Sequence, residues 1–109
     1  MNSVINHKNN SCIWYHTTPN DRVEKILREG LRINSDPGWQ EEPEPWIYVS
    51  TEPFMLSPET TTFEVDLSFL GGLECGWPFT EPGAPDWEDR WQLRVFKDIP
   101  AKYLKVLSS

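Results

Sequence analysis

Two groups of side chains in this sequence are of types that perform acid–base chemistry. His16 follows the apolar run at residues 12–15, and histidine is the side chain that changes its charge most readily near neutral pH. On its own, a histidine at the end of a strand is more often a structural residue than a ligand. Glu64 and Asp66 lie two residues apart and resemble a paired-carboxylate site, although a solvated sheet face is the simpler explanation.

The residues around His16 predict a strand followed directly by a helix over residues 19–29. The run before His16 is apolar and aromatic, as expected for a buried strand, and His16 stands where this strand should end. Thr18 suits the N-cap of the helix, and Asp21, three residues later, completes a capping box. Gly30 is placed to end the helix in a left-handed cap. The histidine is therefore expected at the open end of a strand–helix unit.

The rest of the chain is richer in strands than in helices. Alternating or β-branched patterns predict further strands at residues 46–51, 61–67, 91–96 and 104–107. Clusters of proline, glycine and like charges predict irregular loops at residues 34–45 and 76–87. Strands without regular intervening helices indicate an α+β fold with a mostly antiparallel sheet.

Alternation within two predicted strands separates core side chains from the others. The strand at 61–67 places Phe63, Val65 and Leu67 on one apolar face. The strand at 91–96 places Trp91, Leu93 and Val95 on one apolar face. If that second face is core, Gln92 and Arg94 point together from the other face, either into a cleft or to solvent.

Length and charge limit the class of protein. The 109 residues suit one domain, residues 1–109, in which the polar, Asn-rich residues 1–10 form a loose terminus. Ten Lys and Arg residues against 17 Asp and Glu residues leave a net charge of -7, which argues against a general binder of the nucleic-acid backbone. This charge does not exclude a local basic pocket.

The cysteines and the apolar segments indicate in which cellular compartment the protein is expected. Cys12 and Cys75 are far apart in sequence and nothing in the sequence pairs them, so a reduced, cytoplasmic setting is the default expectation. Residues 1–11 lack the apolar region of a signal peptide, and no apolar run approaches the ~20 residues of a membrane span. The sequence has no Cys/His cluster of the zinc type. We therefore expect neither a membrane partner nor a metal.

Five short segments follow one another in an order that can be compared with known families. They are Tyr-His-Thr at 15–17, Ile-Leu-Arg-Glu-Gly-Leu at 26–31, Ile-Tyr-Val-Ser-Thr at 47–51, Phe-Glu-Val-Asp-Leu at 63–67 and Asp-Ile-Pro-Ala-Lys-Tyr-Leu at 98–104. In this order the chain resembles the small bacterial and phage members of the ADP-ribosyltransferase-like superfamily. This superfamily uses NAD and includes poly-ADP-ribose polymerases and diphtheria-type toxins. The resemblance implies small split antiparallel β-sheets with one main N-terminal helix, and NAD in a cleft between the two sheets.

The resemblance also implies NAD contacts for individual residues. His16 would hydrogen-bond the adenosine-side ribose, and the backbone of Thr17 would contact the nicotinamide carboxamide, although the family usually has glycine at this position. Tyr48 would stack under the nicotinamide ring. Ser50 and Thr51 follow where the family often places supporting hydroxyls.

Gln92 is the best match to the third family motif, an acid or Gln on a late strand, and Glu88 is the alternative. The reaction cleaves the nicotinamide–ribose bond through an oxocarbenium-like state, whose charge such a residue stabilises. A glutamine can position a hydroxyl group but cannot take up a proton. Arg94 would meet the pyrophosphate with paired donors. Gln92 and Tyr48 are thus the candidate catalytic residues.

Three functions are compatible with these observations. The leading one is NAD-dependent transfer of ADP-ribose to an unidentified protein or nucleic-acid acceptor, by a toxin or an anti-defence protein. The second is a catalytically inactive interaction or inhibitor protein of a phage or mobile element on the same scaffold, which mimics nucleic-acid charge. The third is RNA 2′-phosphotransfer, which needs several arginines around a phosphate and is disfavoured by the net charge of -7.

Overall fold

The computed structural model of the protein describes residues 5–6, 8–33, 45–53, 56–70, 80–82 and 92–107. The strands in these ranges are β1 Ile13–Pro19, β2 Ile47–Ser50, β3 Thr60–Asp66, β4 Thr80–Pro82, β5 Gln92–Val95 and β6 Leu104–Val106. The helical segments are α1 Val23–Glu29 and the 3₁₀ turns η1 Asn20–Arg22, η2 Leu67–Leu70 and η3 Ala101–Tyr103. This content confirms the predicted α+β class. None of the helices in the described ranges is long and apolar enough to cross a membrane.

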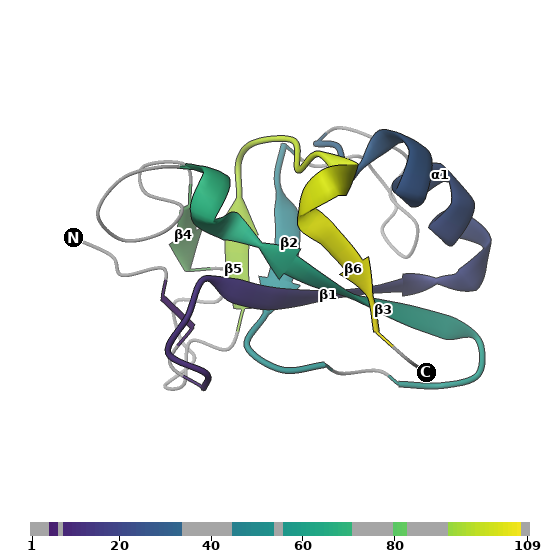
Figure 1. Ribbon diagram of the computed structural model, residues 1–109, viewed down its shortest axis with the longest axis horizontal. Coiled ribbons are helices and arrows are strands. Elements are labelled where there is room, and N and C mark those ends of the chain that lie inside the picture. The colour runs from purple at the N-terminus through teal and green to yellow at the C-terminus, as the bar shows by residue number, and fades with distance from the viewer. Residues whose placement is uncertain are drawn as a thin grey trace.

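The strands form one antiparallel sheet in the order β4-β5-β2-β1-β3-β6. β1 pairs with β3 along its whole length, from Ile13↔Asp66 to Pro19↔Thr60. Its pairing with β2 consists of Tyr15↔Ser50 alone within the described strands. In Figure 1, β1 and β3 run across the view, whereas β2, β4 and β5 run steeply to them. The prediction of two split sheets is therefore not met, because all six described strands belong to one sheet. Its two halves are joined at the narrow β1–β2 junction, which we call the seam.

One face of the sheet carries the hydrophobic core. Phe63 and Val65 of β3 and Val95 of β5 have no exposed area, and Leu93 is also buried, as their alternation predicts. α1 contributes Ile26 to the same cluster. The remaining members come from the sheet, from η2 and from the bridge between the end of α1 and the segment before η3: Trp14, Ile47, Val49, Leu67, Leu70, Leu31 and Ile99. The apolar face thus holds the two halves together where strand pairing does not.

The helix starts differently from the prediction. Thr18 and Pro19 belong to β1 and pair with β3, so the capping box of Thr18 and Asp21 is not formed. α1 begins only after η1, and no side chain caps it. The prediction is wrong because Asn20 is bound to the turn before β3, where its N–H donates to the Glu59 carbonyl oxygen at 2.9 Å. Sheet pairing thereby extends the strand through the expected cap.

Gly30 ends α1 as predicted. Its N–H donates to the Ile26 carbonyl oxygen at 2.7 Å, and its φ of 82° is one that glycine adopts readily. Its ψ of -173° is extended rather than left-handed helical. The reason lies in the next residue, because Leu31 pairs with Ile99 through two backbone hydrogen bonds of 2.9 and 2.7 Å. This bridge brings the end of α1 to the chain segment before η3.

β4 lies within residues 76–87, which we predicted to be an irregular loop. It pairs with β5 through Thr80↔Val95 and Pro82↔Leu93 at the edge of the sheet, where a proline is tolerated because no further ladder bond is needed. The prolines and glycines around it conceal so short a strand in the sequence. Residues 34–44 of the loop predicted at 34–45 lie outside the described residues, as do Trp77, Trp87, Glu88 and Trp91.

The described part of the N-terminal segment is anchored to the sheet. Asn6 has no exposed area, and its side-chain amide donates to the carbonyl oxygens of Ile13 at 2.8 Å and Thr51 at 2.9 Å. Because one amide group binds both β1 and the end of β2, it closes one side of the seam. The prediction of a loose terminus is therefore wrong at Asn6.

Cys12 forms a disulfide, contrary to our expectation of unpaired thiols. The other cysteine in the chain, Cys75, lies outside the described residues. Spacing in the sequence does not reveal which distant cysteines come together, because that depends on the fold. Disulfides persist mainly in oxidising compartments, so this bond counts against a reduced setting, and the cytoplasmic location stays a prediction.

Candidate functional site

A hydrogen bond across the seam holds the His16 imidazole. His16 lies in the middle of β1 and not at its end as predicted, because β3 pairs with β1 as far as Pro19. The Nδ1 atom of His16 lies 2.8 Å from the carbonyl oxygen of Tyr48 in β2. A carbonyl only accepts, so Nδ1 carries the proton that it donates, and Nε2 of the neutral ring is left as an acceptor. The seam therefore contains an oriented imidazole whose second nitrogen can bind a ligand hydroxyl.

The surroundings of His16 favour its neutral form. The side chain is half-buried, and desolvation by burial lowers the pKa of His16 below its ordinary value of 6.5. The hydrogen bond to Tyr48 raises this pKa, because the charged ring donates more strongly, but its effect is the smaller of the two. At neutral pH the ring is thus uncharged and acts by hydrogen bonding.

This lowered pKa predicts that the protein loses stability as the pH falls below about 6.5. In that range the unfolded chain binds a proton at residue 16 that the folded chain does not, so the free energy of unfolding decreases towards the folded pKa. Urea unfolding at about pH 7.5 and about pH 5.5 measures this loss. His16→Gln should show a smaller loss, whereas the matched variant His7→Gln should behave like the wild type. Equal losses for both variants would contradict the role of His16.

A row of polar side chains crosses the opposite face of the sheet. Cross-strand pairs join Tyr15 to Glu64 and to Ser50, and join Ser50 to Gln92. Paired residues project from one face, whereas neighbours along a strand alternate. This polar row therefore faces away from His16 and from the core. The structure brings Gln92 beside Ser50, but it does not place Gln92 and His16 on the same face.

Tyr48 and Arg94 belong to the same face as the polar row and lie next to an aromatic cluster. The guanidinium carbon of Arg94 lies 5.0 Å from the ring centre of Trp46 and 5.8 Å from that of Phe96. Trp46 also contacts the rings of Tyr48 and Phe96 edge-on, at 6.1 and 6.0 Å between centroids. These cation–π and edge contacts hold Arg94 in position over the sheet.

The indole N–H of Trp46 is a further donor in this cluster. Its Nε1 atom is buried and has no hydrogen-bond partner in the described part of the chain. A buried donor without an acceptor is unusual in a folded protein. Trp46 and Phe96 are not among the site residues predicted from the sequence, although both alternate with such residues. Trp46 stands two residues before Tyr48, and Phe96 two residues after Arg94. That spacing is the signal that could have found them.

Two of the residues predicted to contact NAD, Thr17 and Ser50, have side-chain hydrogen bonds inside the protein. Thr17 is buried, and its Oγ1 lies 2.9 Å from Oγ1 of Thr62 in β3. The Ser50 hydroxyl donates to the Glu52 carbonyl oxygen at 2.7 Å. Thr51 is buried beside it. These contacts stabilise the strand ends around the seam, and contacts of Thr17, Ser50 and Thr51 with NAD stay predictions.

Comparisons with known proteins assign this chain to no family. No protein-family model matches the chain. A search of the curated proteins also finds no match. The resemblance to the ADP-ribosyltransferase-like superfamily rests on the five sequence segments and their order alone.

Proposed function

We propose that this protein binds NAD at the seam and transfers ADP-ribose to a macromolecular acceptor. The observation that carries the proposal is the His16 imidazole, whose Nδ1 is held by the Tyr48 carbonyl at 2.8 Å. This bond leaves Nε2 as an oriented acceptor for a ribose hydroxyl, and the neutral ring suits an uncharged partner. The role matches the one that the family resemblance implies for this histidine.

Donors on the other face of the sheet suit the pyrophosphate of NAD. Arg94 carries a planar guanidinium with paired donors, and the buried Trp46 N–H lies beside it. Arginine binds phosphate oxygens with two parallel hydrogen bonds, which fixes the orientation of the group. The acidic chain thus carries a local cationic group where the pyrophosphate is expected.

The proposal requires NAD to cross the seam, because His16 and Gln92 project from opposite faces. Beyond Tyr15↔Ser50, towards the end of β1, the described strands form no further β1–β2 pair. There the His16 imidazole bonds the Tyr48 carbonyl oxygen across the seam. A dinucleotide bound at the seam would contact His16 with one ribose and Gln92 with the other.

Gln92 would act on the bond between nicotinamide and ribose. As this bond breaks, nicotinamide leaves with the bonding electron pair and positive charge develops on the ribose. The amide oxygen of Gln92 can hold a ribose hydroxyl and stabilise that charge. Because an amide cannot take up a proton, the acceptor must lose its own proton to water or to another base. The reaction is therefore expected to be slow.

NAD titration by calorimetry tests the binding step. We expect His16→Ala to weaken NAD binding about fivefold, the value of one hydrogen bond of ~1 kcal/mol to a neutral hydroxyl. The matched variant Glu24→Ala, on the exposed side of α1, should bind like the wild type. A folded His16→Ala protein with unchanged NAD affinity would remove His16 from the site.

A second candidate function is a binding protein without turnover, and the glutamine at position 92 favours it over an enzyme with a carboxylate there. Its partner would be a host factor recognised by the acidic surface. Absence of NAD binding to the wild type, together with tight binding of a partner, would support this function.

A further inference from the structure

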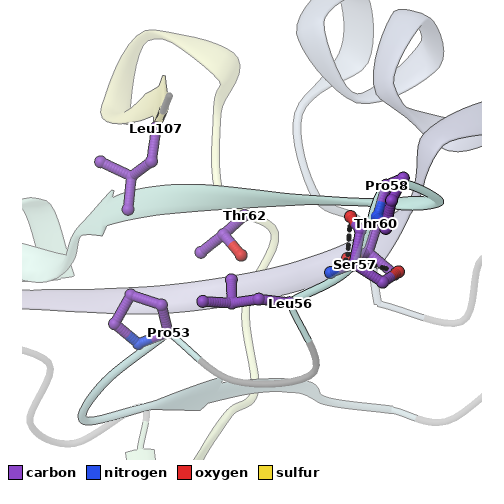
Figure 2. Close-up of a pocket in the computed structure, with 7 residues that line it drawn as sticks. All are labelled: Pro53, Leu56, Ser57, Pro58, Thr60, Thr62 and Leu107. Atoms are coloured by element: carbon purple, nitrogen blue, oxygen red, sulfur yellow. Dashed lines mark hydrogen bonds between the residues drawn. The ribbon is translucent and has the colours of Figure 1, made fainter. Parts of the chain in front are cut away.

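A pocket lies beside β3, and none of the residues that line it is itself assigned to NAD. It is a cavity of about 570 Å³ between β3 and the segment that precedes it. Figure 2 shows the side chain of Thr62 between those of Leu56 and Leu107. The described residues that line the pocket are Pro53, Leu56, Ser57, Pro58, Thr60, Thr62 and Leu107. Its size lies within the range of small-molecule sites in proteins.

The lining of this pocket selects an uncharged ligand. None of the described lining residues carries a charged side chain, and most of them are leucine, proline or threonine. Leu56, which lines the pocket, is 69% exposed. A charged ligand would lose hydration here without gaining a partner, whereas an apolar body would cover Leu56.

The hydroxyls of Ser57 and Thr60 are used within the turn that precedes β3. The Thr60 hydroxyl donates to the Ser57 carbonyl oxygen at 3.3 Å, and the Glu59 N–H donates to the Ser57 hydroxyl at 3.2 Å. These bonds stabilise the turn itself. The remaining hydroxyl among the lining residues is that of Thr62.

Thr62 offers the pocket a buried hydroxyl with unused capacity. It is 5% exposed, and its Oγ1 bonds the Oγ1 of Thr17 at 2.9 Å. This pair of hydroxyls has two protons, but the bond between them uses only one. If Thr17 donates to Thr62, the Thr62 proton is left for an acceptor in the pocket. A ligand carbonyl oxygen would complete this chain of hydrogen bonds, whereas a ligand N–H would leave the Thr17 proton unused.

From this arrangement we infer that the pocket binds an uncharged, mainly apolar small molecule through a carbonyl oxygen that accepts a hydrogen bond from Thr62. None of the lining residues is itself assigned to NAD, but Thr62 bonds the side chain of Thr17, whose backbone is expected to contact NAD, so the two sites adjoin. The hydrogen bond from Thr62 would orient the ligand, and the leucine and proline side chains would provide the apolar contact area.

Acetanilide, a phenyl ring with a neutral amide, is the probe for this site. Titration with acetanilide should shift the backbone amide NMR signals of residues 56, 57, 59–62 and 107 in the wild-type protein. We expect Thr62→Val, which keeps the side-chain shape, to weaken acetanilide binding roughly fivefold to tenfold. Toluene, which lacks the carbonyl, should bind both proteins equally. Benzoate, which is charged, should bind the wild type more weakly than acetanilide does.

Two leucines provide a matched pair of controls. Leu56→Ser should weaken both acetanilide and toluene, because it removes apolar lining. Leu27→Ser, at a 50% exposed leucine on α1, should change neither affinity. The inference is overturned if acetanilide leaves the pocket signals unchanged, or if a folded Thr62→Val protein binds acetanilide as tightly as the wild type.

Discussion

Gln92→Ala is expected to lower the rate of ADP-ribose transfer about 100-fold, the usual effect of removing one group that stabilises charge in a transition state. The loss of NAD affinity should be much smaller, because the bond to the ribose strengthens only as positive charge develops. Gln92 is half-buried at the start of β5, opposite Ser50, so alanine there leaves the strand pairing intact. Mass spectrometry of candidate acceptors incubated with NAD measures the transfer.

Two further variants test whether the effect belongs to the chemistry of residue 92 or to a change of charge nearby. Gln92→Glu introduces a carboxylate that can take up a proton, so its transfer rate should equal or exceed that of the wild type. Glu64→Gln changes a charge in the same polar row, with two strands between it and Gln92, and should alter the rate less than roughly twofold. If Gln92→Ala transfers at the wild-type rate, Glu88 becomes the candidate for the third motif. If no variant and no wild-type sample gives an adduct while a partner still binds tightly, the protein is a binder and not an enzyme.

Gly30→Ala is expected to destabilise the protein by about 3 kcal/mol or more, the largest change in stability that we predict. The φ of 82° at Gly30 strains any residue with a side chain. A Cβ atom would also collide with the Ile99 carbonyl oxygen and lie 2.9 Å from the Ala101 backbone nitrogen. Because both neighbours are backbone atoms, they can move only if the Leu31–Ile99 bridge opens.

Urea unfolding monitored by tryptophan fluorescence measures this effect. Glu29→Ala is the matched control, since it places the same side chain one residue earlier, where α1 has ordinary helical geometry. We expect this control to lie within about 0.5 kcal/mol of the wild type. A Gly30→Ala protein of wild-type stability would show that the close approach of α1 to the segment before η3 is absent in solution.

Local patterns in the sequence determined the strands and their faces. Phe63, Val65, Leu93 and Val95 alternate with polar residues, and a period of two requires no knowledge of the neighbouring strands. Gly30 likewise marked the end of α1, because a positive φ is chiefly a property of glycine. The predicted α+β class follows from the same local evidence.

Long-range pairing decided the features that the sequence did not reveal. Pairing with β3 extends β1 through Thr18 and Pro19. The predicted N-cap at Thr18 therefore does not form, and His16 lies within the strand. β4 forms only because β5 offers it an edge, which no pattern in its own three residues indicates. The disulfide of Cys12 also depends on the fold, since spacing alone pairs no distant cysteines.

Some features of the candidate site could also be predicted from the sequence, whereas others depend on the tertiary structure. The sequence nominated Gln92 and Arg94 together, because alternation places them on one face of β5. Only the tertiary structure could bring the His16 Nδ1 to the Tyr48 carbonyl and Thr17 to Thr62. These contacts form because of the order and register of the strands. The order and register in turn depend on how much apolar area the whole sheet buries, and not on the polar residues that come into contact. The physical reason is that hydrophobic burial is summed over the whole sheet, whereas a sequence pattern describes one segment at a time.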